Sequence, residues 1–233
     1  MPSHDPHVIA VAGGKGGSGK TTTTLGLARA FVDRRTVDGV VAVDADWDLP
    51  NLAPLAVEAG IGARPLSTSD PTAVPTVTEA LRSLDRLPGA DGERRGQDPC
   101  VLRAPTDPED RDASAVLSAV DGIAPRSAVL VDCPAGASPD AVVPLRVADR
   151  SLLVTTLDRP GLHDTTKTAA MARALDCPPA GVVVTRAQSA PDGLAELLGC
   201  PVLGVVPSAP PAPLSTDAVE LAYADVAASL VGS

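Results

Sequence analysis

The sequence predicts a three-layer α/β fold, in which a doubly wound, mostly parallel sheet of about seven strands carries helices on both faces. Short apolar runs, each typical of a buried parallel strand, alternate with amphipathic segments along the 233 residues. Hydrophobic residues make up 44% of the chain, enough for a full core. With one Phe, one Trp and one Tyr, aliphatic side chains must fill that core. We expect a single domain over residues 1–233, with residues 1–6 as a flexible tail.

The first predicted strand and helix enclose a glycine-rich loop. The apolar run 7–12 precedes the loop, and apolar residues at helical spacing follow it over 23–31. Residues 14–21 fit G-x-x-x-x-G-K-[ST], the P-loop, in which backbone N–H groups and a helix N-terminus bind polyphosphate. The predicted phosphate-binding residues are Gly14, Lys15, Gly16, Gly17, Ser18, Gly19, Lys20, Thr21 and Thr22. We expect the Lys20 amine to reach the β- and γ-phosphates and the Thr21 hydroxyl to bind Mg²⁺.

The second predicted strand, 39–43, ends in a run of carboxylates. Asp44, Asp46 and Asp48 follow it directly. The carboxyl ends of strands are where open α/β sheets bind ligands, so these side chains are candidates for a site. We expect Asp44 either to hold the geometry of this loop or to lie in the magnesium shell. An acidic, solvated loop is the alternative in so acidic a chain.

Between residues 58 and 99 the periodic signal weakens. Stretches rich in Pro, Gly and charge at 65–71 and 88–99 are typical of loops, and 77–87 has the spacing of a short amphipathic helix. Such loops are either plain surface or segments that respond to nucleotide or contact a partner. A short strand is expected at 100–105 and a helix at 112–120.

The apolar run 128–131 ends in Asp132, the Walker B pattern. Mg²⁺ prefers hard oxygen ligands and keeps several of its waters, so we expect Asp132 to hold one of those waters opposite Thr21. Gly136, four residues later, would let the next loop approach the γ-phosphate.

The remaining chain continues the alternation. Strands are expected at 151–156, 181–186 and 202–206, and helices at 138–148, 162–175 and 216–230. The last helix has no basic face for anionic lipid, because no Lys or Arg follows Arg186, so we expect it to pack on the sheet. No apolar run approaches the ~20 residues that span a membrane.

Three blocks together resemble the MinD/ParA family of P-loop ATPases: K-G-G-x-G-K-T-T from Lys15, D-x-D followed by P-N-L from Asp44, and D-x-P-A-G from Asp132. The resemblance covers nearly the whole chain. It implies that Lys15 contacts nucleotide phosphates, often those of the partner subunit in an ATP-bound dimer. It also implies that Asp46 positions the attacking water close to the metal.

The resemblance departs from the family pattern at the predicted adenine contact. The family usually has Asn-Arg at the end of the strand 181–186, with the asparagine recognising adenine, and this chain has Thr185-Arg186. A threonine hydroxyl cannot make the paired contact of an amide. We expect Thr185, Arg186 and the loop that begins at Pro207 to share the contacts with the base.

The resemblance implies a MinD-like ATPase that controls dimerisation and partner binding in spatial positioning, as in cell division, polarity or machinery placement. Lys15, Lys20 and Asp46 would be catalytic, and Thr21, Asp46 and Asp132 would bind the metal. ATP and Mg²⁺ would lie at a homodimer interface, and a protein partner is expected. The alternatives are a ParA-type partition ATPase and a nucleotide-binding regulatory module with little or no turnover.

Charge and cysteine usage exclude some classes of function. The net charge of −10, with few lysines, is typical of proteins from salt-loving organisms and predicts a halophilic habitat. No cluster of Lys or Arg is visible outside the P-loop, which disfavours direct nucleic-acid binding. The four cysteines form no C-x-x-C pair, which excludes an iron–sulfur carrier and favours reduced thiols in a cytoplasmic protein.

Overall fold

The computed structural model describes residues 8–34, 37, 39–61, 98–105, 117 and 127–231. The predicted tail at 1–6, the loop at 65–71 and the helix at 77–87 lie outside the described residues. Two residues of the predicted loop 88–99 are described, Asp98 and Pro99, and only Leu117 of the helix expected at 112–120.

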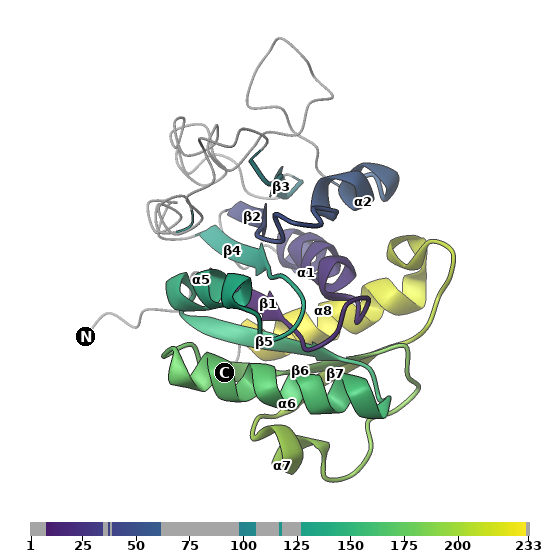
Figure 1. Cartoon of the computed structure of the whole chain (residues 1–233). Coiled ribbons are helices and arrows are strands. Elements are labelled where there is room, and N and C mark those ends of the chain that lie inside the picture. Colours follow the sequence, from purple (N-terminus) through teal and green to yellow (C-terminus); the bar gives the residue numbers. More distant parts are fainter. Residues whose placement is uncertain are drawn as a thin grey trace, which may run out of the picture.

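The described residues form one seven-stranded sheet in which every pairing is parallel. Its strands are β1 (Val8–Ala12), β2 (Gly39–Asp44), β3 (Cys100–Leu102), β4 (Ser127–Asp132), β5 (Arg150–Thr155), β6 (Pro179–Thr185) and β7 (Val202–Val206). Their order is β3-β2-β4-β1-β5-β6-β7, from top to bottom in Figure 1. From β1 the chain therefore runs through β2 to one edge at β3, returns to β4 beside β1, and then runs outward through β5 and β6 to the other edge at β7, as the doubly wound prediction requires.

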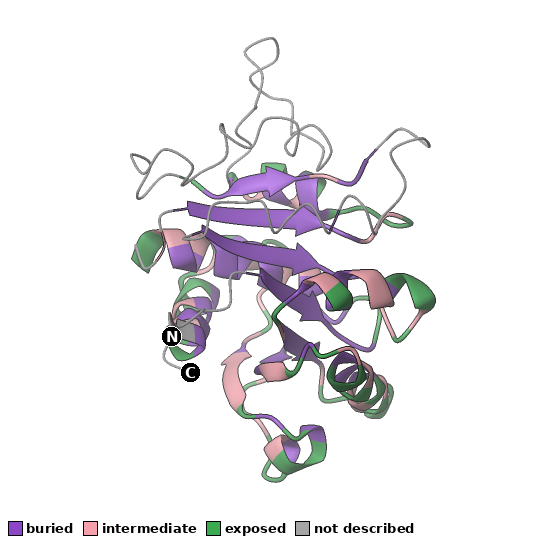
Figure 2. Ribbon diagram, turned by 90° about the vertical axis from the view of Figure 1, so that its left-hand side faces the viewer, coloured by how far each residue is buried: buried purple, intermediate pink, exposed green. Residues whose placement is uncertain are grey.

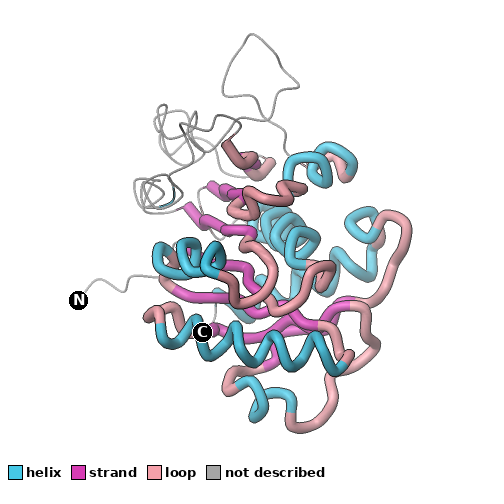
Figure 3. The backbone as a smooth tube through the Cα atoms, viewed as in Figure 1, coloured by secondary structure: helices cyan, strands magenta, loops and turns pink. Residues whose placement is uncertain are grey.

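Helices cover both faces of this sheet, so the three-layer prediction is confirmed (Figures 1 and 3). The helices are α1 (Lys20–Arg34), α2 (Leu52–Glu58), α5 (Pro139–Val147), α6 (Arg159–Ala174), α7 (Leu194–Leu198) and α8 (Asp217–Val231). Alternate strand residues reach opposite cores: Ile9 packs with α1, α2 and α8, while Val8 and Ala10 pack in the core that includes α5 and α6. The central strands are buried along their whole length, as Figure 2 shows.

Two helix starts differ from the prediction, and two helices were not predicted. Helix α1 begins at Lys20 rather than at residue 23, because the end of the P-loop is also the first turn of the helix. Helix α6 begins at Arg159 rather than at 162, because the Asp158 side chain accepts a hydrogen bond from the Gly161 amide and caps it. Helices α2 and α7 were not predicted. Each is shorter than two full helical turns, which is too short to show a recognisable periodicity.

The C-terminal helix packs as predicted. Helix α8 contacts β7 and α1, and Val219, Val226 and Leu230 are buried there. Tyr223 of α8 lies against α1, where its hydroxyl is 3.1 Å from Thr23 Oγ1. None of the described helices is both long and apolar enough to cross a bilayer.

Candidate functional site

The P-loop joins β1 to α1 at the carboxyl edge of the sheet, and its glycines are required by space and backbone geometry. Gly17 and Gly19 have φ of 75° and 95°, which side chains disfavour. A Cβ on Gly14 would lie 2.1 Å from the backbone carbon of Asp164 in α6. The loop is therefore shaped partly by its own dihedral angles and partly by the neighbouring helix.

Groups behind the P-loop bind its carbonyl oxygens. The Thr185 hydroxyl at the end of β6 lies 2.6 Å from the Ser18 carbonyl oxygen, and Arg186 donates to the Gly17 carbonyl. The Gly136 amide donates to the Gly13 carbonyl at 3.1 Å. These hydrogen bonds engage carbonyl oxygens of the loop backbone. The concave side of the loop is therefore available to its N–H groups.

The loop also contains an orphaned polar atom. Ser18 Oγ is the one buried side-chain nitrogen or oxygen, among the residues that the structure describes, without a hydrogen-bond partner. A buried hydroxyl without a partner is costly, so this atom indicates that a polar ligand completes the loop. A phosphate oxygen fits that requirement.

The two lysines of the loop have different surroundings. The Lys20 side chain is buried, and its Nζ lies 3.3 Å from the Lys15 carbonyl oxygen. Lys15 is exposed, and its Nζ lies 3.3 Å from Asp158 Oδ1.

Hydrogen bonds from Thr156, from the Gly161 amide and from Lys15 lower the pKa of Asp158 to about 2. Sequence reasoning missed Asp158, although an aspartate two residues before a proline is a recognisable helix cap.

Two buried carboxylates face the loop from neighbouring strands. Asp44 and Asp132 are paired in register at the ends of β2 and β4. Burial raises the pKa of Asp132 to about 7, while a hydrogen bond from Thr21 lowers it and the charge of Asp44 raises it. Lys20 also lowers the pKa of Asp132 through its charge. Thr21 and Asp132 therefore meet in the structure, as the sequence predicts.

This arrangement fits a magnesium ion shared with a polyphosphate. Two adjacent buried carboxylates with raised pKa values lack full charge compensation, and a divalent cation would supply it. Within the described parts of the chain, no three His, Cys, Asp or Glu side chains form a metal cluster. An ion here would take one or two protein ligands and complete its shell with phosphate and water, as Mg²⁺ does.

Asp44 organises the acidic loop that follows β2. Its carboxylate oxygens accept hydrogen bonds from the Asp46 and Leu52 amides, each at 3.1 Å. The Leu52 amide begins α2, so Asp44 caps that helix from eight residues away. Two roles are expected for Asp44, and these hydrogen bonds show the structural one, in which its carboxylate holds the geometry of the loop.

Asp46 lies half-buried in the same loop. Its Oδ1 accepts a hydrogen bond from the Leu49 amide at 3.3 Å, so this oxygen faces its own turn. Its charge acts on Asp44 and Asp132, whose pKa values it raises. The three aspartates and Lys20 therefore form one electrostatic unit next to the P-loop.

Because these carboxylates are buried, we predict that the stability of the nucleotide-free protein falls as the pH rises. Burial raises the pKa of Asp44 and of Asp132 from 3.8 to about 7, so the folded state binds more protons than the unfolded state between these values. The free energy of unfolding should then fall by roughly 5 kcal/mol from pH 5 to pH 8. Urea unfolding at both pH values measures this difference.

The matched variants for this prediction are Asp44→Asn and Asp225→Asn. The first removes a buried carboxylate and should reduce the pH dependence by about half, whereas Asp225 is exposed on α8 and its replacement should leave the dependence unchanged. Wild-type stability that is equal at the two pH values would contradict the prediction.

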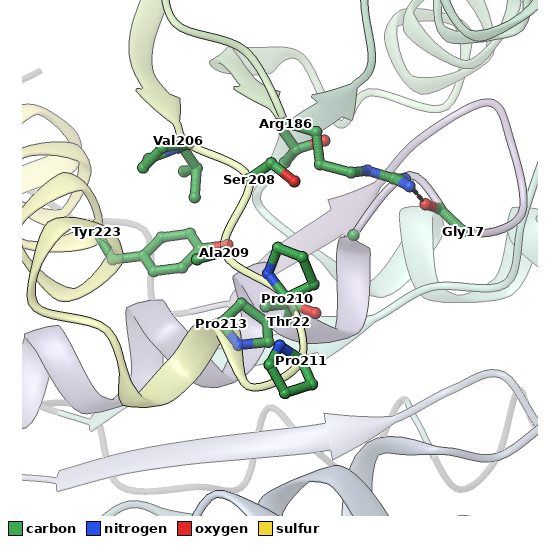
Figure 4. Close-up of a pocket in the computed structure, with 13 residues that line it drawn as sticks. Gly17, Thr22, Arg186, Val206, Ser208, Ala209, Pro210, Pro211, Pro213 and Tyr223 are labelled. Atoms are coloured by element: carbon green, nitrogen blue, oxygen red, sulfur yellow. Dashed lines mark hydrogen bonds between the residues drawn. The ribbon is translucent and has the colours of Figure 1, made fainter.

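A hollow of about 280 Å³ opens beside the P-loop (Figure 4). Gly17, Gly19 and Thr22 line it from the loop and α1, and the segment after β7 lines it with several prolines. The three residues predicted to contact adenine, Thr185, Arg186 and Pro207, all line this hollow. The structure therefore places the three residues predicted to contact the base beside three of the residues predicted to bind phosphate, Gly17, Gly19 and Thr22.

Comparison with known proteins gives results in agreement with this geometry. The model of the CobQ/CobB/MinD/ParA nucleotide-binding domain matches residues 9–213. Septum site-determining protein MinD of Synechocystis is 28% identical over 218 residues, covering 86% of this chain and 75% of the relative.

Two solved structures share the fold. MinD of Pyrococcus horikoshii, complexed with Mg-ADP, has a TM-score of 0.69 at 23% identity, covering 95% of this chain and 94% of its own. A chain of the MinC:MinD cell division protein complex of Aquifex aeolicus has a TM-score of 0.70 at 22% identity, covering 97% of this chain and 96% of its own.

Proposed function

We propose, from the premise that this chain belongs to the CobQ/CobB/MinD/ParA nucleotide-binding family, that it binds ATP with Mg²⁺ and hydrolyses it slowly. The observation that carries the proposal is the partnerless Ser18 hydroxyl inside a glycine loop that has Lys20 and two buried carboxylates beside it. A triphosphate and a divalent cation together would satisfy all of these groups. The Pyrococcus horikoshii relative is complexed with Mg-ADP, which supports an adenine nucleotide with Mg²⁺ as the ligand.

Each group has a role that follows from its surroundings. The loop N–H groups and Lys20 would hold the phosphates, and Lys15 would neutralise charge in the transition state. Thr21, Asp132 and Asp46 would hold the cation and its water shell, and bound Mg²⁺ would supply further charge neutralisation. Asp46 would orient the attacking water after its carboxylate turns from the Leu49 amide.

ATP would bind at the interface of a homodimer in the cytoplasm. Lys15 supports this, because its side chain is exposed at the surface, where its Nζ lies 3.3 Å from Asp158 Oδ1 and a second subunit would meet it. Hydrolysis would then loosen the dimer and release a protein partner. The Aquifex aeolicus relative assembles with MinC, which supports a partner and a role in positioning, such as cell division.

Phosphate release with the variant Asp46→Ala tests this proposal. We expect turnover to fall about a hundredfold, because the variant loses the group that orients water. Binding of Mg·ADP, measured by calorimetry, should remain within about threefold, because the phosphate cradle is intact and Thr21 and Asp132 would still hold the cation. Asp48→Ala is the matched control, since Asp48 is an exposed carboxylate two residues away, and it should retain wild-type turnover.

The outcomes separate the candidate functions. Equal turnover in wild type and Asp46→Ala would remove Asp46 from the mechanism. Nucleotide binding by the wild type without any phosphate release would select the regulatory module instead. ATP-dependent retardation of DNA at physiological salt would favour a ParA-type partition ATPase.

A further inference from the structure

A second hollow, of about 240 Å³, lies between the acidic loop that follows β2 and the first two turns of α5. Residues 45–48 line it from the loop, and Pro134, which follows β4, and Leu117 line it as well. Among the described residues, none lines both this hollow and the one beside the P-loop. The second hollow is therefore a separate feature, which meets the candidate nucleotide site only at Asp46.

The lining of this second hollow has a rigid apolar part. Trp47 is half-buried, and its indole N–H donates a hydrogen bond to the Asp44 carbonyl oxygen at 3.0 Å, which holds the ring in place. Leu117 and Pro144 are buried, and Val143 is half-buried. Side chains that are already held lose little conformational entropy when a ligand covers them. This part of the hollow therefore suits the apolar stem of a partner's side chain.

The charged side chains of the second hollow are all acidic. Asp46, Asp48 and Asp140 line it, and its described lining contains no Lys, Arg or His. Asp48 and Asp140 are exposed, and neither forms an ion pair with another described residue. An anionic ligand would be repelled by these carboxylates. The occupant that complements the hollow therefore carries a positive charge on an apolar stem.

We infer that the second hollow docks a protein partner through an arginine side chain that the partner carries among apolar residues. This docking rests on the proposed function, in which hydrolysis releases a protein partner. A guanidinium group is planar, makes paired hydrogen bonds with carboxylates and stacks on aromatic rings, whereas the ammonium of lysine is a compact and strongly hydrated point charge. A metal ion fits less well, because within the described chain no three His, Cys, Asp or Glu side chains form a metal cluster.

Trp47 is the only tryptophan of the chain, so its fluorescence reports directly on the second hollow. We expect an acetylated and amidated peptide of alternating leucine and arginine to change this fluorescence saturably in the full, nucleotide-free chain at physiological salt. A peptide with citrulline, which keeps the shape of arginine without its charge, should bind at least about tenfold more weakly. A peptide with lysine should bind about threefold more weakly than the arginine peptide.

Calorimetry of the same titrations detects any binding that leaves the fluorescence unchanged. Equal affinities for the arginine and citrulline peptides, or no binding of the arginine peptide by either method, would overturn the inference. Equal affinities for the arginine and lysine peptides would overturn the choice of arginine. Sedimentation of the nucleotide-free chain tests a second copy as the occupant, and a dimer that Asp140→Asn dissociates would also overturn the inference.

Asp140→Asn and Asp225→Asn are the matched variants for the peptide titrations, since each removes one exposed carboxylate from a helix. Asp140→Asn should weaken binding of the arginine peptide by about three- to tenfold. Asp225→Asn, on α8, should weaken it by less than about 1.5-fold, because salt screens distant charges. Equal weakening in the two variants would show attraction to the net charge of −10 instead of docking, and would overturn the inference. Thermal melting checks folding, and Asp48→Asn replaces Asp140→Asn if that variant does not fold.

Calorimetry with Mg·ADP separates this inference from the proposed function. Asp140 lies outside the P-loop, so Asp140→Asn should bind Mg·ADP like the wild type. A wild-type chain that binds the arginine peptide but not Mg·ADP would refute the nucleotide site and leave the docking site in place. A chain that binds Mg·ADP but not the peptide would refute the docking site alone.

Discussion

Lys20→Ala should lower ATP turnover by about a hundredfold or more and weaken the binding of Mg·ADP, because the cation that faces the phosphates is lost. The Lys20 side chain is only 7% exposed, and its charge acts on the buried carboxylate of Asp132. A water molecule that entered the vacated space would not carry the missing positive charge. Phosphate release and calorimetry measure the two effects separately.

Lys167→Ala is the matched control for Lys20→Ala. The chain has three lysines, and Lys167 is the one outside the P-loop. It lies on the surface of α6, where its Nζ is 3.4 Å from Asp164 Oδ1. Exposed pairs of this kind contribute less than about 1 kcal/mol, so turnover, binding and stability should all stay close to wild type. Equal turnover in the two variants would refute the assignment of Lys20.

Gly14→Ala should lower the free energy of unfolding by about 3 kcal/mol and the melting temperature by about 6–12 °C. The new Cβ would lie 2.1 Å from the Asp164 carbonyl carbon and 2.2 Å from the Thr165 amide nitrogen. These are backbone atoms of α6, which cannot turn aside as a flexible side chain can. The loop must therefore shift, and affinity for Mg·ADP should fall by at least about tenfold.

Gly16→Ala is the matched control in the same loop. A Cβ on Gly16 would meet no atom within 4 Å, and the backbone is not in the left-handed region. Its effect on stability should stay within about 0.5 kcal/mol. Thermal unfolding followed by circular dichroism compares the two variants, and equal melting temperatures would contradict the steric account.

The strands could be predicted because their signal is local. Each lies in an apolar run, and burial on both faces of a parallel sheet requires such a run. Helix α2 lacked an equivalent signal. Its first amide is capped by the Asp44 side chain rather than by Asn51 at its own N-terminus, where the side chain makes no capping hydrogen bond. A cap from eight residues earlier has no counterpart in helical spacing, so only the fold reveals it.

The same distinction applies to the candidate site. The glycine pattern predicted the P-loop, and the apolar run before Asp132 predicted a carboxylate near Thr21, which the structure brings together. The conformation of Asp46 was not predictable, because its contact with the Leu49 amide depends on how the whole loop turns. The pairing of Lys15 with Asp158 joins residues 143 positions apart.

The sequence by itself determined the fold class, the family and the residues that form the glycine-rich loop, because periodicity and motif spacing are properties of neighbouring residues. Only the tertiary structure decided what surrounds that loop. Strand β1 lies between β4 and β5, with β6 next in order, and this places Asp132, α6 and Thr185 around one glycine loop. Contacts between such distant segments depend on strand order, and strand order is set by the packing of the whole sheet.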